Sequence, residues 1–308
     1  MFFKNARIYR ITDIAALAGV DIHAALEQHP ASDPGAQSLS AEGWVSPYPG
    51  VGGGLILPVA EGPSTATYSV VMVHQEAARI LPPAVIRDKL NERCAEIQKR
   101  EGRPVGRKER ADLKDQITFE LLPQAFIKRT RTRLLMMGDY LVVDTASPAR
   151  AEQVISCLRR ALGTLPVQPL TLENSLQVVG TEWLRAGPPA GLELGDRLHL
   201  VGPDDCRAVF TNVDCNCEEV LAHLDQGFVV SRIEVANGEL AFCLDADLSL
   251  RRVQMLDLVQ EKISGIDVEH AAEEAEATYT IMVATLTEAL DQMVAALGGE
   301  ADAPGEMA

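Results

Sequence analysis

The chain has 308 residues, of which 47% are hydrophobic and 23% are charged, and a formal net charge of −16. This composition is ordinary for a globular protein, and the length favours two lobes over one. The apolar runs at residues 55–60 and 69–73 have the length of strands, and the first residues lack the apolar region of a secretory signal. These features exclude a membrane protein, and we expect a cytoplasmic one.

The first 78 residues alternate between extended and helical patterns. We expect a strand over residues 6–11, a helix over 13–28, an extended segment over 43–46 and a strand over 67–74. A glycine-rich run at residues 50–54 suggests a phosphate-binding loop, but no Gly-Lys-Ser/Thr follows it. Because the next residues, 55–58, are strand-like, a hairpin turn is favoured there.

Residues 79–133 carry charge opposite in sign to that of the rest of the chain. They contain 15 Lys/Arg and 8 Asp/Glu, a balance of +7, while the remaining residues contain 13 basic and 36 acidic ones, a balance of −23. If these basic groups share a surface, they create a local potential that attracts a polyanion despite the negative net charge.

Two helices are predicted within this basic segment. The first begins at Pro82-Pro83 and ends by Gly102, and the second covers residues 108–122. The run 128–133 follows; as a strand it places three arginines on one face and two threonines on the other. Arginines at this spacing repel one another unless an anion or solvent covers them.

The residues that follow predict a hairpin and a capped helix. Residues 134–137 and 140–143 flank the two-residue turn Gly138-Asp139. Ser147-Pro148 is typical of a helix start, and Gly163 of a helix end. Prolines between residues 165 and 191 indicate a link between lobes.

The C-terminal half repeats a similar order of elements, which hints at an internal duplication. We expect a strand over residues 207–213, a helix over 216–225 with Asn216 as its N-cap, and strands over 228–235, 240–244 and 248–256. A long helix over 268–297, with an apolar stripe and an acidic face, ends the pattern.

Catalytic and metal-binding motifs are absent from the sequence, so we expect neither an enzyme nor a cofactor. The close pair Cys215/Cys217 has only His223 as a nearby imidazole, and a helix start explains it better than a zinc site does. Asp204-Asp205 and Asp245/Asp247 could serve a metal-dependent nuclease, but solvated turns explain them better.

A binding module accounts for the basic segment better than an enzyme does. Cations spread over two helices, a loop and a strand are suited to phosphate contacts rather than base reading. The alternatives are a solvated helix face with local ion pairs, and an interaction scaffold whose basic arm docks an acidic partner. The candidate DNA-binding residues are Arg87, Lys89, Arg93, Lys99, Arg100, Arg107, Lys108, Arg110, Lys114, Lys128, Arg129, Arg131 and Arg133.

An ordered series of short blocks resembles the RdgC family of bacterial recombination-associated proteins over nearly the whole chain. The blocks in the basic segment lie at residues 80–86, 113–115 and 121–126. The flanking blocks are Phe3-Lys4-Asn5, Gly43-Trp44-Val45, Asp144-Thr145-Ala146-Ser147, Leu165-Pro166-Val167 and Thr181-Glu182-Trp183-Leu184.

The resemblance implies a homodimer that closes into a ring with a basic hole, encircles double-stranded DNA with little sequence preference and restrains RecA-mediated recombination. It also implies association with the nucleoid. Phe126, Asn212 and Val213 are the candidate dimer contacts. Where family members can carry Lys and Gln before the C-terminal helix, this chain reads Thr211-Asn212-Val213-Asp214.

Together these observations predict an α+β fold with two lobes of mixed sheet and helices. Residues 1–78 and 134–180 form the N-terminal lobe, and residues 79–133 form a basic helical segment between strands of that lobe. Residues 181–308 form the C-terminal lobe with its long terminal helix.

Overall fold

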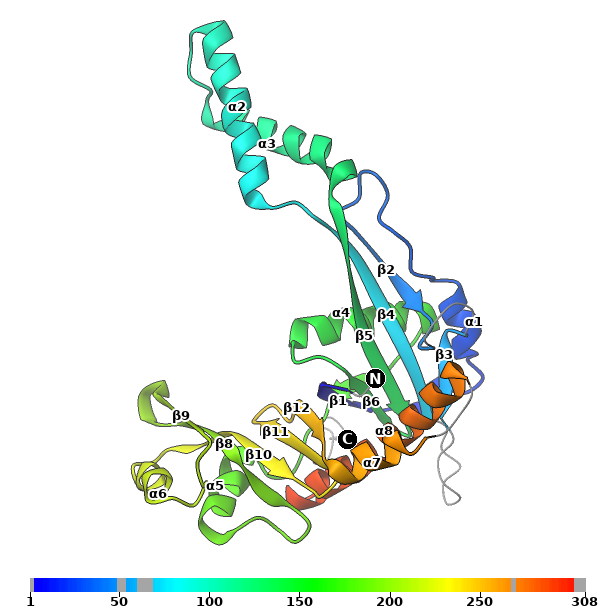
Figure 1. Cartoon of the computed structure of the whole chain (residues 1–308), viewed down its shortest axis with the longest axis vertical. Coiled ribbons are helices and arrows are strands. Elements are labelled where there is room, and N and C mark those ends of the chain that lie inside the picture. Colours follow the sequence, from blue (N-terminus) through cyan, green and yellow to red (C-terminus); the bar gives the residue numbers. More distant parts are fainter. Residues whose placement is uncertain (1–2, 49–53, 60–68, 267–269, 302–308) are drawn as a thin grey trace, which may run out of the picture. The chain divides into compact units, whose positions relative to one another are not determined.

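The computed structural model describes residues 3–48, 54–59, 69–266 and 270–301, which adopt the expected α+β class (Figure 1). The chain divides into two compact units. The large unit comprises residues 1–25, 46–73 and 132–308, and the small unit comprises residues 26–45 and 74–131. Strands β4 (Ser69–Ile80) and β5 (Phe126–Met137) begin in one unit and end in the other.

An antiparallel sheet forms the centre of the large unit. After β5, the strands follow in the order β6, β1, β12, β11, β10, β8 and β9, and β7 also pairs with β1. The antiparallel partner of β4 in this unit is β3. Their bounds are β1 Asn5–Ile11, β3 Ile56–Val59, β6 Tyr140–Val143, β7 Val167–Pro169, β8 Glu193–Val201, β9 Arg207–Thr211, β10 Val229–Ala236, β11 Leu240–Asp245 and β12 Leu250–Met255.

Strand β1 connects the N-terminal and C-terminal halves of this sheet. It pairs with β6 through Ile8 opposite Val142, and with β12 through Ala6 opposite Leu250. All four side chains are buried. One continuous core therefore includes residues from both ends of the sequence.

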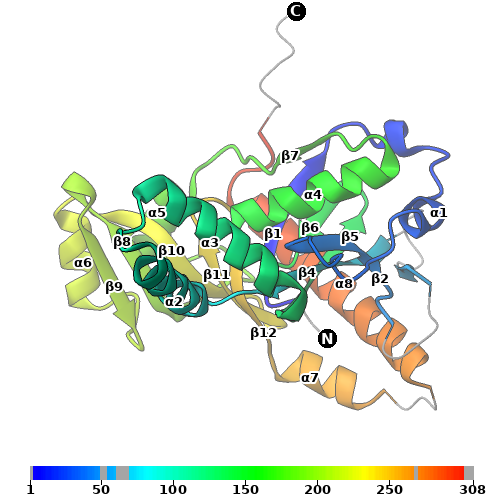
Figure 2. The same ribbon diagram turned by 90° about the horizontal axis from the view of Figure 1, so that it is seen from above.

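Five helices belong to the large unit among the described residues: α4 (Pro148–Leu162), α5 (Leu176–Ala186), α6 (Glu218–Asp225), α7 (Asp257–Ser264) and α8 (Ala271–Ala296). Figure 2 shows α6 beside β8 and β9. Helix α8 buries Tyr279, Met282 and Leu286 in the core, as its apolar stripe predicts. No helix in the described parts of the chain combines the length and apolarity that a membrane crossing requires.

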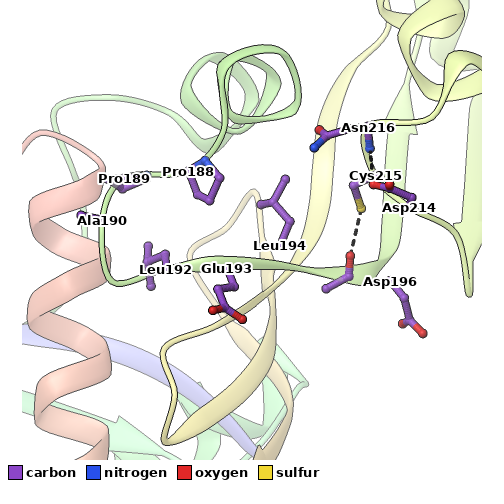
Figure 3. Close-up of a pocket in the computed structure, with 11 residues that line it drawn as sticks. Pro188, Pro189, Ala190, Leu192, Glu193, Leu194, Asp196, Asp214, Cys215 and Asn216 are labelled. Atoms are coloured by element: carbon purple, nitrogen blue, oxygen red, sulfur yellow. Dashed lines mark hydrogen bonds between the residues drawn. The ribbon is translucent and has the colours of Figure 1, made fainter.

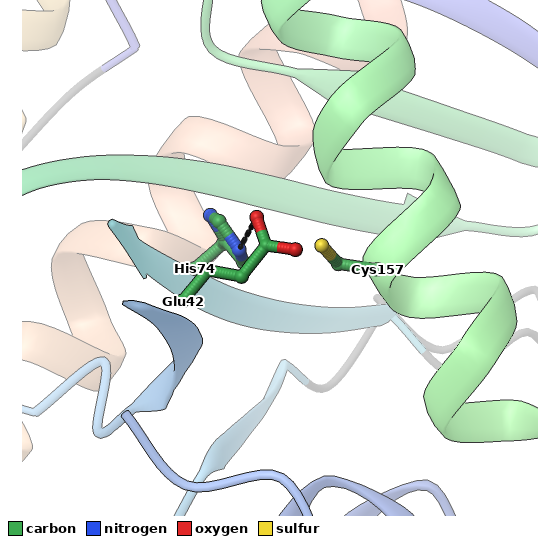
Figure 4. Close-up of side chains that lie close together, drawn as sticks. All are labelled: Glu42, His74 and Cys157. Carbon is green, nitrogen blue, oxygen red and sulfur yellow. Dashed lines mark ion pairs between the residues drawn. The ribbon is translucent and has the colours of Figure 1, made fainter. Parts of the chain in front are cut away.

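The small unit contains β2 (Ser40–Val45), the second part of β4, helices α2 (Pro83–Glu101) and α3 (Arg107–Leu121), the 3₁₀ turn η2 (Leu122–Gln124) and the start of β5. Its strand portion buries the ring of Trp44 edge-on against the ring of His74, with 5.4 Å between centroids. Glu42 lies 3.7 Å from the Nε2 atom of His74 (Figure 4).

Most expected elements are confirmed. The predicted helix boundaries at Gly102, Ser147 and Gly163 are those of the structure, since Gly102 and Gly163 have left-handed φ angles and the Ser147 hydroxyl accepts the Arg150 N–H. The hairpin around Gly138-Asp139 places Met137 opposite Tyr140. The expected strands over 228–235 and 240–244 are joined by a turn at Asn237-Gly238, where the Asn237 side chain accepts the N–H of Leu240.

Three expectations differ from the structure. The helix over residues 13–28 is two short pieces, η1 (Ile14–Leu17) and α1 (Ile22–Glu27), because Gly19 adopts a φ of +81° between them. The N-cap of α6 is Cys217, not Asn216, whose N–H is held by Asp214. Helices α5 and α7 and strand β8 were not predicted. The glycine-rich run at residues 50–54 lies mostly outside the described residues.

Arg79, at the end of β4, connects two turns of the small unit. Its Nη1 atom donates to the carbonyls of Leu122 at 3.0 Å and Pro123 at 3.4 Å. Its Nη2 atom donates to the carbonyls of Pro34 at 3.1 Å and Gly35 at 3.4 Å. One of the fifteen cations of the basic segment is therefore structural.

We predict that Arg79→Ala lowers the free energy of unfolding by about 2–3 kcal/mol, because carbonyls that a charged donor satisfies lose their partner. Arg87→Ala is the matched control. That side chain is exposed, and its ion pair among the described residues is with the equally exposed Asp88 at 3.8 Å, so its removal should change stability by less than about 0.5 kcal/mol. Chemical denaturation measures both, and equal effects would contradict the assignment of Arg79.

Candidate nucleic-acid interface

Helices α2 and α3 form a hairpin held by an apolar seam (Figure 1). Leu90 of α2 and Ile117 and Leu121 of α3 are buried in it. Ile86, Cys94 and Leu113 pack against these residues at intervals of four, which is one helical turn. Because each helix turns this stripe toward the other, the seam determines which of the remaining side chains share a flank of the hairpin.

One flank, which we name the basic flank, carries cations, and among the described residues only Asp88 pairs with one of them, at 3.8 Å from Arg87. On α2, Arg87, Asn91 and Gln98 follow one another at intervals of four and seven residues; on α3, Arg107, Arg110, Lys114 and Thr118 do so at intervals of three and four. The Nη2 atom of Arg110 donates to the Asn91 side chain at 2.7 Å, so the two rows are adjacent. The basic flank therefore comprises Arg87, Arg107, Arg110 and Lys114.

The opposite flank mixes charges of both signs. Arg93 of α2 lies 3.4 Å from the Glu120 carboxylate of α3. At the tip of the hairpin, Arg103 pairs with both Glu101 and Glu109, at 2.8 and 2.7 Å, and this contact lowers the pKa of the Glu109 carboxyl. Arg100 also pairs with Glu101, at 2.8 Å. Carboxylates therefore already neutralise much of the positive charge on this side.

The thirteen predicted residues fall into two groups by their partners. All are exposed except Arg133, which is half-buried. The paired group, with an acceptor or carboxylate within the chain, is Arg87, Arg93, Arg100, Arg110, Arg129, Arg131 and Arg133. Six have neither an ion pair nor a side-chain hydrogen bond with any described residue: Lys89, Lys99, Arg107, Lys108, Lys114 and Lys128.

The arginines of β5 each have a separate partner. Arg129 forms a two-pronged contact with the Asp33 carboxylate, with both Nη2–oxygen distances at 2.7 Å. Arg131 donates to the Gln75 side chain at 3.0 Å. Thr132, between Arg131 and Arg133, is buried, whereas Thr130 is exposed, so burial alternates only at the second of the two threonines. Intramolecular acceptors therefore reduce the repulsion that the sequence suggested.

The three candidate dimer contacts lie at the start of β5 and after β9. Phe126 is 86% exposed, which is unusual for so large an apolar side chain. Asn212 is exposed and has a left-handed φ of +56°, a conformation that asparagine tolerates better than most residues. Val213 is half-buried.

Of the carboxylates considered for a nuclease, Asp204 and Asp205 are exposed in the turn before β9, and the other two pair with arginines. Asp245 is buried and pairs with Arg232 and Arg251. Asp247 pairs with Arg7 at 2.9 Å. These contacts neutralise the charge that a divalent metal would require.

A cavity of about 710 Å³ lies beside the turn after β9 (Figure 3). Its apolar wall includes Pro188 and Leu192, and its carboxylates belong to Glu193, Asp196 and Asp214. No Lys or Arg belongs to its lining, so this part of the surface repels phosphate. The cavity is therefore distinct from the basic flank in its charge.

These features define an α+β protein that presents a cationic helical hairpin. The family model described as "Putative exonuclease, RdgC" matches residues 1–300. The chain is 35% identical to the recombination-associated protein RdgC of Laribacter hongkongensis, over 98% of this chain and 100% of the relative. It is 34% identical to the protein of the same name from Pseudomonas aeruginosa strain LESB58, over 97% of this chain and 98% of the relative. The chain therefore belongs to the RdgC family.

The cysteines provide a chemical test of the described geometry. Cys215 is 3% exposed, its thiol donates to the Gly195 carbonyl at 3.1 Å, and burial raises its pKa to about 11. Cys206 is exposed. We predict that iodoacetamide at pH 8 modifies Cys206 well before Cys215, because only the thiolate reacts and burial blocks access. Peptide mass spectrometry over time measures this order, and equal rates would contradict the buried position of Cys215.

Proposed function

We propose that the protein binds double-stranded DNA without sequence preference, as a ring-shaped homodimer that encircles the duplex and restrains RecA-mediated recombination. The observation that carries the proposal is the basic flank, where four cations lie together and only Arg87 has a carboxylate partner among the described residues. A surface of this kind attracts a polyanion even when the net charge of the protein is −16. Membership of a recombination-associated family supports the same partner.

The expected contacts are with phosphates. The cations of the basic flank stand on two different helices, and neither helix presents a row of side chains suited to base edges alone. Phosphate contacts give affinity that is independent of sequence and falls steeply with salt. All thirteen predicted residues remain candidates, and those without a carboxylate partner are the ones we expect to contribute most.

The dimer contacts are proposed from the family resemblance, and the exposure of Phe126 and Asn212 supports two of the three. A twofold ring needs two separate self-complementary contacts, and the exposed ring of Phe126 suits the first of them. Asn212 and Val213 suit the second. A closed ring of this kind would act as a barrier on DNA, so the proposed restraint of recombination requires no catalysis.

The first experiment compares retention on circular and linear forms of one plasmid during a high-salt wash, together with the mass of the free protein. A dimer that stays on circular DNA and slides off linear DNA would support encirclement. Equal loss from both forms would leave only an open electrostatic surface. Negligible binding at physiological salt would favour an interaction scaffold that docks an acidic partner.

We predict that the variant Arg107→Gln/Arg110→Gln/Lys114→Gln, which removes three cations of the basic flank that have no carboxylate partner among the described residues, lowers the slope of log affinity against log salt by about 2.7, since each lost phosphate contact removes about 0.9. The slope should fall by the same amount for DNA duplexes of unrelated sequence. The matched control is Arg93→Gln/Arg100→Gln/Arg103→Gln, which removes three charges that already have carboxylate partners. A control that loses as much slope as the test variant would show that the basic flank is not the DNA surface.

We predict that Phe126→Asp shifts the protein from dimer toward monomer, because it places a charge in the centre of the proposed contact. Phe119→Asp, on α3, is the control, since Phe119 is also an exposed aromatic residue but is not a proposed contact. Light scattering across a dilution series measures the mass of both variants. A Phe126→Asp protein that keeps the mass of the unmodified protein would remove Phe126 from the interface.

A further inference from the structure

A second cavity, of about 480 Å³, lies in the large unit where β1, β5, β12 and α7 meet. Its seven lining residues are Phe3, Lys4, Arg133, Val253, Gln254, Met255 and Gln260. Two of them are cations, two are carboxamides, three are apolar and none is a carboxylate. Its volume is within the range of small-molecule sites.

A backbone hydrogen bond and the Asp144 carboxylate hold the two cations of this cavity in place. The N–H of Val253 donates to the Lys4 carbonyl at 2.9 Å, which joins the start of the chain to β12. Asp144 accepts the Lys4 N–H at 3.0 Å through Oδ1 and the Arg133 guanidinium at 3.2 Å through Oδ2. Asp144 thus anchors both residues, although it is not part of the lining.

The charge of the cavity favours an anion. The Lys4 ammonium is exposed and has no ion pair with a described residue. Arg133 has five N–H donors, and its contacts with Asp144 and Tyr279 leave others available. Because Asp144 offsets one of the two positive charges, the cavity keeps a positive balance that an oxyanion would complete.

The remaining walls suit a base attached to that anion. Met255 is half-buried and offers an accessible apolar surface, and the buried side chains of Phe3 and Val253 lie behind it in the lining. The Gln254 and Gln260 side chains lie at the same cavity, and Gln260 uses its Nε2 atom to hold the Met255 carbonyl at 2.8 Å. A carboxamide can pair with the polar edge of a base.

We propose that this cavity binds one nucleotide through its 5′-phosphate, with Lys4 and Arg133 on the phosphate and the apolar wall against the base. The nucleotide is either free or the 5′-terminal residue of a DNA strand. The second source deepens the proposed function and rests on it, because it would let the protein distinguish a strand end from continuous duplex. The first source is independent of DNA binding.

The test uses the full chain and two probes, deoxyadenosine 5′-monophosphate and deoxyadenosine, in a calorimetric titration. We expect the monophosphate to bind about tenfold to a hundredfold more tightly, as loss of charge-assisted hydrogen bonds implies. Lys4→Gln should weaken monophosphate binding by about tenfold. Arg207→Gln is the control, since it removes one positive charge from an exposed residue of β9 that neither lines the cavity nor belongs to the proposed DNA contacts. Equal binding of both probes, or no monophosphate binding, would overturn the proposal.

Duplexes with a 5′-phosphate or a 5′-hydroxyl identify the source. If the protein binds the phosphorylated duplex more tightly than the hydroxyl duplex, and Lys4→Gln abolishes that difference, the ligand is the strand end. If it binds both duplexes equally but binds the monophosphate more tightly than the nucleoside, the ligand is the free nucleotide. If the unmodified protein binds the monophosphate but neither duplex, the result would contradict the proposed function and leave the cavity proposal standing. Normal duplex binding without any phosphate effect would contradict the cavity alone.

Discussion

The apolar seam between α2 and α3 is the constraint on which the candidate interface depends. Leu90, Ile117 and Leu121 bury one stripe of each helix, and burial of such side chains contributes about 1.5–3 kcal/mol each. Once that stripe faces inward, the helical period determines on which flank of the hairpin each remaining side chain lies. The hydrophobic contact thereby sorts the charges, and neither helix alone would gather its cations beside those of the other.

Carboxylate pairing then distinguishes cations that are equivalent in composition. Arg93, Arg100 and Arg103 form ion pairs with glutamates of the same unit, and Arg79 donates hydrogen bonds to backbone carbonyls. Exposed pairs of this kind stabilise the fold by less than about 1 kcal/mol, but they reduce the potential that a phosphate experiences nearby. Arg107 and Lys114 have no such partner among the described residues. The positions of the Asp and Glu residues therefore define the basic flank as much as the positions of the Lys and Arg residues do.

The same logic of paired and unpaired charge extends to the large unit. Asp245 and Asp247 have arginine partners, which makes them poor metal ligands, while Lys4 lies at a cavity and has no ion pair with any residue that the structure describes. The acidic cavity beside Asp214 and the cationic cavity beside Arg133 therefore suit ligands of opposite charge. A chain of strongly negative net charge can in this way keep separate places for anions.

The sequence by itself determined the elements that follow from local rules. Helical spacing and the caps at Ser147, Gly102 and Gly163 predicted α4 and the hairpin, and charge counting found the basic segment. Local rules missed the break at Gly19, because the sequence does not show whether a glycine adopts a left-handed or a helical φ angle. They also could not identify the partners Asp33 and Asp144, which lie 96 and 11 residues from Arg129 and Arg133. Only the tertiary structure decided which cations are free, because pairing depends on distance in space and charge counting contains no distances.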